Sequence, residues 1–256
     1  HSMEKSGLNV EEVDKLTGPV IGRPKSATFR TSDVVGLDTL VHVANGLAKA
    51  CPNDERKDVF QLPPFIQQMM ESNRLGSKTG EGFYKKVKQE DGSSEIMVLD
   101  LTSGQYRSQN KRSFPTLELT RNIDRVADRF KVLVSGKDAA ADFYRNQFGQ
   151  LFAYVSHRIP EISDEVYRID DALRAGFGWE HGPFQIWDAI GLEKGIALAE
   201  QSGFPVAEWV KQMAANGQSS FYSIAEGVRR CYVPSQRATD RIKGTEQYID
   251  LDELRR

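Results

Sequence analysis

The chain has 256 residues, of which 39% are hydrophobic and 27% charged, and its formal net charge is −2 at pH 7. This length accommodates one large domain or two of ordinary size, and the composition is that of a soluble globular protein. The near-neutral charge and the lack of a long lysine or arginine block give no reason to expect nucleic acid as a partner. No apolar run approaches the roughly 18 to 20 residues of a membrane span, and no signal-peptide pattern opens the sequence. We therefore expect a cytoplasmic protein without a membrane span.

The cysteines and histidines do not form a metal-binding or catalytic pattern. Cys51 and Cys231 lie far apart, without a C-x-x-C motif, so we expect neither a disulfide framework nor a metal site. His42, His157 and His181 each lack a neighbouring serine, cysteine or spaced carboxylate that would indicate a catalytic dyad. The sequence favours packing or surface positions for all three histidines.

The first predicted helix covers residues 10–16. Val10, Val13 and Leu16 recur there at helical spacing, and Asp14 is expected on the polar side. A glycine-containing turn over residues 18–22 follows this helix.

The chain then reaches Phe29, Asp33 and a Gly36-Leu37 step that opens an apolar helix. The hydrophobic residues predicted to share one face of that helix are Leu37, Leu40, Val41, Val43, Ala44 and Leu47. A proline-led helix over residues 63–70 comes next, and Gly82, Phe83 and Tyr84 close the unit.

Residues 83–106 change character from helical to strand-like. Asp91-Gly92 stands there between two β-prone runs, which is the strongest short-range signal for a hairpin. We therefore predict a small β-hairpin between the helical parts.

Residues 107–159 return to helical periodicity. Arginines and lysines between 107 and 137 are interleaved with apolar residues, which favours a linker ending in an amphipathic helix over a nucleic-acid patch. A stronger helix is predicted over 138–159, with Pro160 ending it. The residues expected on its apolar face are Phe148, Leu151, Phe152, Val155 and Ile159.

A second copy of the first pattern occupies residues 162–222. Ile162, Val166, Ile169 and Ala172 predict a helix in which Asp170 matches Asp14. A turn over 176–182, Phe184, Asp188, the step Gly191-Leu192, a Pro205-led helix and the pair Phe221-Tyr222 repeat the order of the first copy. We expect Asp33 and Asp188 to cap helices rather than to act in catalysis. The repeat predicts a tandem duplication of one helical unit.

The two copies differ at their start. The predicted helix over 138–159 leads the second copy, and the first copy has no equivalent because the chain begins almost at Gly7. If each copy needs this helix to cover its core, the chain is a fragment cut within its first domain. We expect a first domain over 4–106, a linker over 107–137, a second domain over 138–232 and a connector over 233–256.

Motifs for nucleotide binding are missing from the sequence. No G-x-G-x-x-G follows a strand, and the stretch from Gly76 to Gly80 has the wrong spacing for a phosphate loop. A turn that seats Phe83 and Tyr84 in the core is the favoured interpretation. Residue patterns alone thus indicate a mostly helical tandem protein without a visible active site.

Several motifs resemble those of (S)-3-hydroxyacyl-CoA dehydrogenases. The stretch from Gly22-Arg23-Pro24 to Asp33-Val34-Val35-Gly36-Leu37-Asp38-Thr39, followed by Lys78-Thr79-Gly80-Glu81-Gly82-Phe83-Tyr84, is similar to the C-terminal helical domain of that family. Gly182-Pro183-Phe184 with Asp188 and Gly191 supplies the matching motif in the second copy. The resemblance covers nearly the whole chain. It implies a mainly α fold with two tandem domains of the 6-phosphogluconate-dehydrogenase C-terminal-like type and a small β-hairpin near 83–106.

The resemblance also implies which residues have a role. It marks Asp33, Gly36, Lys78, Gly82, Phe83, Tyr84, Gly182, Pro183, Phe184, Asp188 and Gly191 as structural motif residues, and it places no catalytic residue in this segment. Residues Lys25, Ser26, Ala27, Thr28 and Phe29 match the family turn that lines the substrate cleft, although their sequence departs from the family's apolar Met-Gly-Pro-Phe. A binding role and a plain structural turn both remain open there. Asn146 stands at the position of a catalytic asparagine but in the second copy, which favours a packing or surface residue.

The implied parent protein oxidises (S)-3-hydroxyacyl-CoA to 3-ketoacyl-CoA with NAD in fatty-acid β-oxidation. Its partners would be an acyl-CoA substrate, an NAD-binding domain absent from this chain, an enoyl-CoA hydratase domain in the same parent and a thiolase. The segment itself is expected to bind no NAD, to pair domains, to form part of the acyl-CoA cleft and to be inactive alone. The alternative is a non-catalytic helical scaffold or interaction module.

Overall fold

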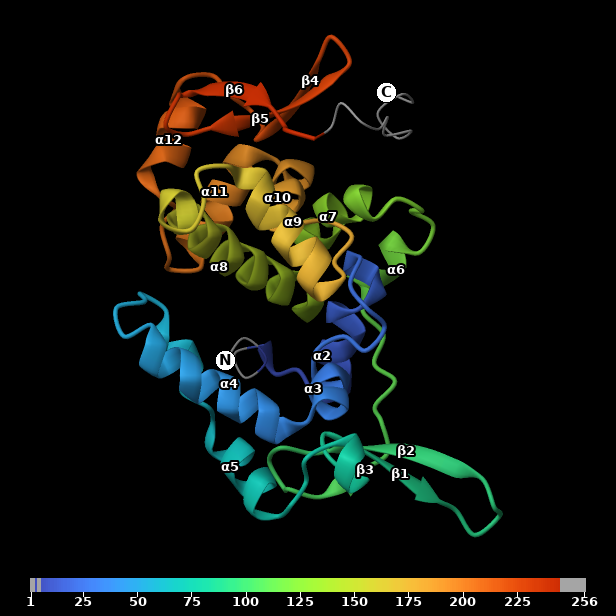
Figure 1. The fold of residues 1–256 in the computed structure, drawn as a ribbon. Helices are drawn as coiled ribbons and strands as arrows, with labels where there is room; N and C mark the ends of the chain where they lie inside the picture. The colour runs from blue at the N-terminus through green and yellow to red at the C-terminus, as the bar shows by residue number, and fades with distance from the viewer. Residues whose placement is uncertain (1–2, 4–5, 245–256) are drawn as a thin grey trace. The chain divides into compact units, whose positions relative to one another are not determined.

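The computed structural model describes residues 3 and 6–244, which fold into two compact units. The N-terminal unit contains residue 3, residues 6–19 and residues 24–113, and the C-terminal unit contains residues 20–23 and 114–244. Helices predominate in both units, as Figure 1 shows, so the predicted mainly α class is confirmed. The domain limits expected at 106, 138 and 232 stay a prediction, and the part of the expected connector beyond residue 244 lies outside the described residues.

Apart from the helix over residues 29–35, which was not predicted, the helices of the N-terminal unit lie where the apolar spacing predicts them. They are α2 (Val10–Thr17), α3 (Phe29–Val35), α4 (Leu37–Ala50) and α5 (Pro64–Glu71), with short 3-10 turns at Lys57–Phe60 and Ser77–Thr79. Another 3-10 turn, Pro19–Ile21, crosses the limit between the units. The core collects residues from these helices and from the following strands: Val10, Leu37, Ile66, Met69, Phe83, Tyr84, Val98 and Leu99.

A three-stranded antiparallel sheet closes the N-terminal unit. Its strands are β1 (Tyr84–Lys88), β2 (Ser94–Leu99) and β3 (Tyr106–Arg107), in the order β1-β2-β3. Gly92 has a φ of 83°, which suits glycine in the turn between β1 and β2. The predicted hairpin is therefore confirmed, and the two-residue strand β3 extends it.

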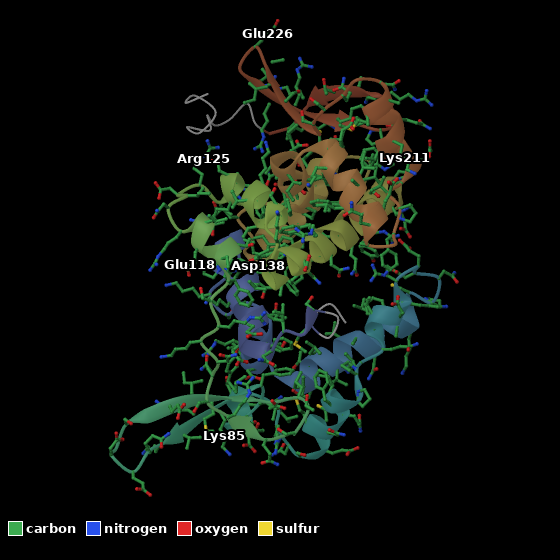
Figure 2. All side chains as sticks on the ribbon, turned by 180° about the vertical axis from the view of Figure 1, so that it is seen from behind. Lys85, Glu118, Arg125, Asp138, Lys211 and Glu226 are labelled. Atoms are coloured by element: carbon green, nitrogen blue, oxygen red, sulfur yellow. The ribbon has the colours of Figure 1, made fainter. Side chains whose placement is uncertain are left out.

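The C-terminal unit contains one long helix, α8, among shorter ones. Its helices are α6 (Pro115–Thr120), α7 (Val126–Ser135), α8 (Ala139–Glu161), α9 (Val166–Phe177), α10 (Pro183–Ile190), α11 (Leu192–Gln201) and α12 (Glu208–Ala215). Asp138, labelled in Figure 2, lies at the start of α8. It caps the helix by accepting a hydrogen bond from the backbone N–H of Ala141, and it also accepts one from the hydroxyl of Thr116. The helix leaves helical geometry at Ile159, directly before Pro160, as the proline predicts. The α8 helix packs against α7, α10 and α11.

A second antiparallel sheet, which the sequence analysis missed, closes the C-terminal unit. It contains β4 (Tyr222–Ala225), β5 (Val228–Val233) and β6 (Ala238–Arg241), in the order β4-β5-β6. Glu226 and Gly227 form the tip of its first hairpin with φ of 55° and 73° (Figure 2). Positive φ at both positions is the geometry of a hairpin turn, but Glu-Gly is a weaker signal than Asp-Gly. Both repeats thus run from helices into a three-stranded meander.

Aromatic side chains fill the core of the C-terminal unit. Trp187 stacks on Phe152 of α8 with ring centroids 4.7 Å apart and meets Phe221 at 5.0 Å. Its indole N–H donates to the carbonyl of Leu192. A Cβ on Gly195 would lie 1.9 Å from Trp187 Nε1, so only glycine fits there.

No helix among the described residues is long and apolar enough to cross a membrane.

We expect Gly195→Ala to lower the free energy of unfolding by about 1–3 kcal/mol, because the added methyl group overpacks the Trp187 site. Trp179, Trp187 and Trp209 all lie in the C-terminal unit, so tryptophan fluorescence during urea denaturation reports on this unit. Gly46→Ala is the matched control in α4, where a Cβ meets nothing within 4 Å. Gly46→Ala should raise the free energy of unfolding by roughly 0.5–1 kcal/mol. Unfolding of this variant is followed by circular dichroism. Equal effects of the two substitutions would contradict the packing argument.

Candidate functional site

Asp14 fixes the turn that contains the predicted substrate residues. Its carboxylate accepts hydrogen bonds from the backbone N–H groups of Thr28, Phe29 and Arg30 at 3.0, 2.6 and 3.0 Å. The hydroxyl of Tyr84 donates a fourth bond at 2.8 Å. Asp14 is half-buried on α2, and its carboxylate holds the first turn of α3 and the start of β1 together.

Asp33 lies within α3, and its predicted role as a helix cap was wrong. Its carboxylate accepts the backbone N–H groups of Phe83 and Tyr84, both at 2.8 Å. A Cβ on Gly82 would lie 2.2 Å from Asp33 Oδ1, and one on Gly76 would lie 2.3 Å from the Asp33 carbonyl oxygen. The glycines of this motif therefore make room for Asp33 rather than for a phosphate.

The second repeat reproduces both carboxylate arrangements. Asp170 accepts the backbone N–H groups of Phe184 and Gln185 at 2.8 and 3.0 Å and the hydroxyl of Tyr222 at 2.8 Å. Asp188 accepts the backbone N–H groups of Phe221 and Tyr222 at 2.8 and 2.9 Å. Asp14 and Asp33 thus have structural counterparts in Asp170 and Asp188.

Burial changes the acidity of these groups. Loss of solvation raises the pKa of Asp170 to about 7 and that of Asp188 to about 7, against the lowering effect of their hydrogen bonds. The pKa values of Asp14 and Asp33 are raised by the same cause. Burial also raises the pKa of Tyr84 and Tyr222, which keeps both hydroxyls available as donors.

The five predicted substrate residues lie together on the turn that precedes α3. Lys25 and Thr28 are exposed, whereas Ser26, Ala27 and Phe29 are half-buried. Ala27 has a φ of 51°, an uncommon left-handed conformation for a residue with a Cβ. Strain of this kind clusters at functional sites, although the surrounding hydrogen bonds also account for it.

The hydroxyl groups of this turn are linked to one another. Thr31 Oγ1 donates to Ser26 Oγ at 2.8 Å and also contacts the carbonyl of Ala27 at 2.7 Å. The hydroxyl oxygens of Thr17 and Thr28 are 2.8 Å apart. The turn therefore presents oriented hydroxyl groups beside one lysine, which suits a polar or anionic ligand.

The remaining motif residues define the repeated helix junctions. Gly36 and Gly191 have φ of 103° and 110°, and each begins the helix that follows it, α4 or α11. Lys78 pairs with Asp38 at the N-terminal junction. In the second repeat, Gly182 precedes α10, Pro183 occupies its first position and Phe184 is fully buried.

Comparison with known proteins agrees with these motifs. Residues 1–86 match the family model described as 3-hydroxyacyl-CoA dehydrogenase, C-terminal domain. Over 220 residues, or 86% of the chain, the sequence is 43% identical to a probable 3-hydroxyacyl-CoA dehydrogenase of Bacillus subtilis. Residues 1–86 thus belong to the C-terminal-domain family of 3-hydroxyacyl-CoA dehydrogenases, and most of the chain is similar to a probable member of that enzyme class.

Two further relatives match smaller or more divergent parts of the chain. A probable 3-hydroxyacyl-CoA dehydrogenase of Deinococcus radiodurans is 50% identical over 88 residues, which are 34% of this chain and 25% of the relative. A putative fatty acid oxidation complex trifunctional enzyme of Rickettsia prowazekii is 21% identical over 187 residues, 73% of this chain and 24% of the relative. The chain covers only 27% of the Bacillus relative, so it spans about a quarter of the proteins it matches.

The histidines and Asn146 of this dehydrogenase region occupy packing or surface positions. His181 is half-buried against Phe130, and burial lowers its pKa. His157 Nε2 lies 3.1 Å from the carbonyl oxygen of Pro205. Asn146 accepts a hydrogen bond from Gln150 in the same helix. His42 lies exposed on α4.

A metal site and a dinucleotide site each need a specific grouping of residues or strands. Within residues 3 and 6–244, no group of three or more acidic, histidine or cysteine side chains could hold a metal ion. The two sheets of this part are antiparallel meanders, whereas a dinucleotide cradle needs a βαβ unit with parallel strands. The described residues therefore do not fit NAD.

We expect the free energy of unfolding of the C-terminal unit to fall as pH rises from 5 to 8. Asp170 and Asp188 titrate near 7 when folded and near 3.8 when unfolded, so the folded state holds protons that the unfolded chain has released. Urea denaturation followed by tryptophan fluorescence at several pH values measures this slope.

Asp188→Asn is the matched variant for the pH experiment. It removes one titrating carboxyl group and should make the decline with pH shallower. Because the pKa of His181 is lowered, this residue makes the free energy of unfolding rise with pH. It is present in both the unsubstituted chain and Asp188→Asn, so it does not affect their comparison. An unchanged slope in the variant would show that Asp188 does not hold a proton in the folded state.

Proposed function

We propose that this chain is the tandem helical region of an NAD-dependent 3-hydroxyacyl-CoA dehydrogenase that acts in fatty-acid β-oxidation. The parent would oxidise (S)-3-hydroxyacyl-CoA to 3-ketoacyl-CoA. Within it, the N-terminal unit forms part of the wall of the acyl-CoA cleft, and the second repeat serves as its internal pairing partner. The catalytic residues and the NAD site would lie in a separate domain, so the segment alone is inactive.

The observation that carries this proposal is a difference between equivalent helices α3 and α10. Counted from the matching Phe29 and Phe184, Ser32 occupies the position of the fully buried Trp187. Thr31 likewise occupies the position of the buried Ile186. The second repeat fills this place with its own aromatic core, whereas the first repeat keeps small hydroxyl side chains there. A ligand-binding role is therefore supported for the first repeat only.

The turn before α3 supplies what binding of a CoA ester requires. The exposed ammonium group of Lys25 can attract phosphate groups, and the linked hydroxyls of Ser26 and Thr31 can orient polar groups of the ligand. The carboxylate of Asp14 holds the backbone of this turn in place. These residues would bind and orient the substrate, and NAD held by the other domain would supply the hydride-transfer chemistry.

Reconstitution tests the proposed function. The purified chain is mixed with acetoacetyl-CoA and NADH, with and without the NAD-binding domain of the Bacillus relative, and nicotinamide absorbance is followed. We expect no turnover by the chain alone and turnover after mixing, because the NADH site and the group that protonates the reduced ketone would come from the added domain. The added domain alone is the control.

The other outcomes of this assay have distinct meanings. Turnover by the chain alone would contradict the separation of catalytic residues from this segment. If no mixture oxidises NADH although circular dichroism shows both proteins to be folded, the result would favour the scaffold or interaction module. A hydratase domain and a thiolase as further partners belong to the same proposal, and the oxidation complex named for the Rickettsia relative supports them.

Substitution of Lys25 tests the cleft assignment separately. In the reconstituted enzyme, Lys25→Ala should raise KM for acetoacetyl-CoA by about 1.4–5-fold with kcat unchanged, because an exposed charge contributes about 0.2–1 kcal/mol. Lys88→Ala, an exposed lysine on β1, is the matched control and should leave KM unchanged. An equal effect of both substitutions would point to overall charge rather than to a site.

A further inference from the structure

Arg30 is held in place from both its backbone and its side chain. Its backbone N–H donates to the carboxylate of Asp14 at 3.0 Å. Its guanidinium carbon lies 4.4 Å from the centre of the Tyr84 ring, and the hydroxyl of that ring donates to Asp14 at 2.8 Å. The stack on the ring orders the cation before any ligand arrives, which lowers the entropic cost of binding.

The guanidinium group of Arg30 keeps its hydrogen-bond donors for a ligand. Among residues 3 and 6–244, no carboxylate forms an ion pair with this group and no acceptor takes a hydrogen bond from it. The residue is half-buried, but its side-chain nitrogens are not among the buried ones that lack a partner. Its donors therefore face solvent, where an anion can accept two of them at once.

The second repeat has a helix-capping residue at the position of Arg30. In the register that aligns α3 with α10, Arg30 corresponds to Gln185. The side-chain oxygen of Gln185 accepts the backbone N–H of Gly182 at 3.0 Å. The equivalent N–H of the first repeat, that of Ala27, donates to the Pro24 carbonyl at 2.9 Å instead. Arginine has no acceptor, so this position has lost the capping role and has gained a cation.

The charge also differs at the start of the same turn, where Lys25 corresponds to Glu180. The first repeat thus places two positive side chains where the second repeat has one negative and one neutral side chain. The backbone N–H groups of residues 28–30 are already bonded to Asp14, so recognition of a ligand at this turn falls to the side chains. Charge complementarity therefore favours an anion at the first repeat alone.

We propose that Arg30 binds a phosphate group of the CoA ester and thereby makes the first repeat selective for phosphate-bearing thioesters. The planar guanidinium group donates two parallel hydrogen bonds to phosphate oxygens, whereas the ammonium group of Lys25 attracts the anion without fixing its direction. This inference rests on the proposed function, because it takes an acyl-CoA as the ligand of this turn.

Isothermal titration calorimetry of the full chain with CoA, and separately with pantetheine, tests the proposal without turnover. Pantetheine has the thiol arm of CoA but no phosphate group. We expect CoA to bind at least about fivefold more tightly than pantetheine, because a charge-assisted contact to phosphate is made only with CoA. Arg30→Gln, which introduces the residue of the second repeat, should weaken CoA binding by about 3–10-fold and leave pantetheine binding unchanged.

Arg229→Gln is the matched control for the loss of one charge beside a tyrosine. Arg229 lies 5.4 Å from the centre of the Tyr222 ring, and Tyr222 donates to Asp170 as Tyr84 donates to Asp14. This variant should leave CoA binding unchanged. Equal weakening by Arg229→Gln and Arg30→Gln would show attraction by net charge and would overturn the assignment.

Arg30→Lys separates binding of phosphate from support of the fold. Burial raises the pKa of Asp33, and the positive charge of Arg30 opposes this rise. Lysine keeps that charge but lacks the planar pair of donors. Arg30→Lys should therefore unfold in urea at the same midpoint as the unsubstituted chain and recover only part of the CoA binding. Full recovery of binding by lysine, or equal weakening of CoA and pantetheine by Arg30→Gln, would overturn the proposal.

The calorimetric result and the reconstitution assay fail independently. If the unsubstituted chain does not bind CoA, or binds CoA and pantetheine equally, the role of Arg30 is overturned whether or not the mixture with the NAD-binding domain turns over. If CoA binds through Arg30 but no mixture oxidises NADH, the phosphate contact stands and the dehydrogenase assignment falls.

Discussion

Carboxylates that bind backbone N–H groups hold each repeat together. Asp14 and Asp170 accept the amides at the start of α3 and α10, and Asp33 and Asp188 accept the amides at the start of the sheets. One tyrosine in each repeat, Tyr84 or Tyr222, ties the two carboxylate groups to the same strand. Because buried N–H groups without acceptors are costly, this arrangement fixes where the helices end and the sheet begins.

These hydrogen bonds from backbone N–H groups to aspartates explain why the two repeats could diverge without losing their fold. The aspartates and the junction glycines are shared, whereas the residues between them differ in size and polarity. Ser32 replaces Trp187, and Val43 replaces Leu198, and each of these positions remains helical. One repeat can therefore carry a packed aromatic core while the other offers hydroxyl groups.

Periodicity predicted most of the fold because packing of the helices follows local apolar spacing. The helices led by Val10, Leu37 and Val166 and the hairpin at Asp91-Gly92 are such cases. The second sheet was missed because Glu226 and Gly227 form its hairpin turn. A Glu-Gly pair predicts a turn only weakly. The roles of Asp33 and Asp188 were missed for another reason. Asp33 meets its partners 50 and 51 residues along the chain, and no local pattern records so distant a pairing.

Segment 20–23 also contacts residues far along the chain, since it belongs to the first repeat in sequence and to the C-terminal unit in structure. The Gly22 carbonyl accepts the backbone N–H of Glu180 at 2.8 Å, and the Arg23 guanidinium lies 3.7 Å from the centre of the Trp179 ring. Burial lowers the pKa of Arg23 to about 10, so the group keeps its charge at neutral pH and the stack keeps its cation–π character. A Cβ on Gly22 would lie 2.8 Å from the Cβ of Glu180, so only glycine fits at this contact.

The consequence concerns why the two repeats share one chain. The C-terminal unit is completed by four residues that come from within the first repeat, so cutting the chain between residues 113 and 114 would remove part of its packing. Covalent linkage keeps this segment at high effective concentration for its partners at Trp179 and Glu180. A duplicated helical unit in one polypeptide thereby obtains a contact that separate copies would have to form by association, at the cost of their translational and rotational freedom.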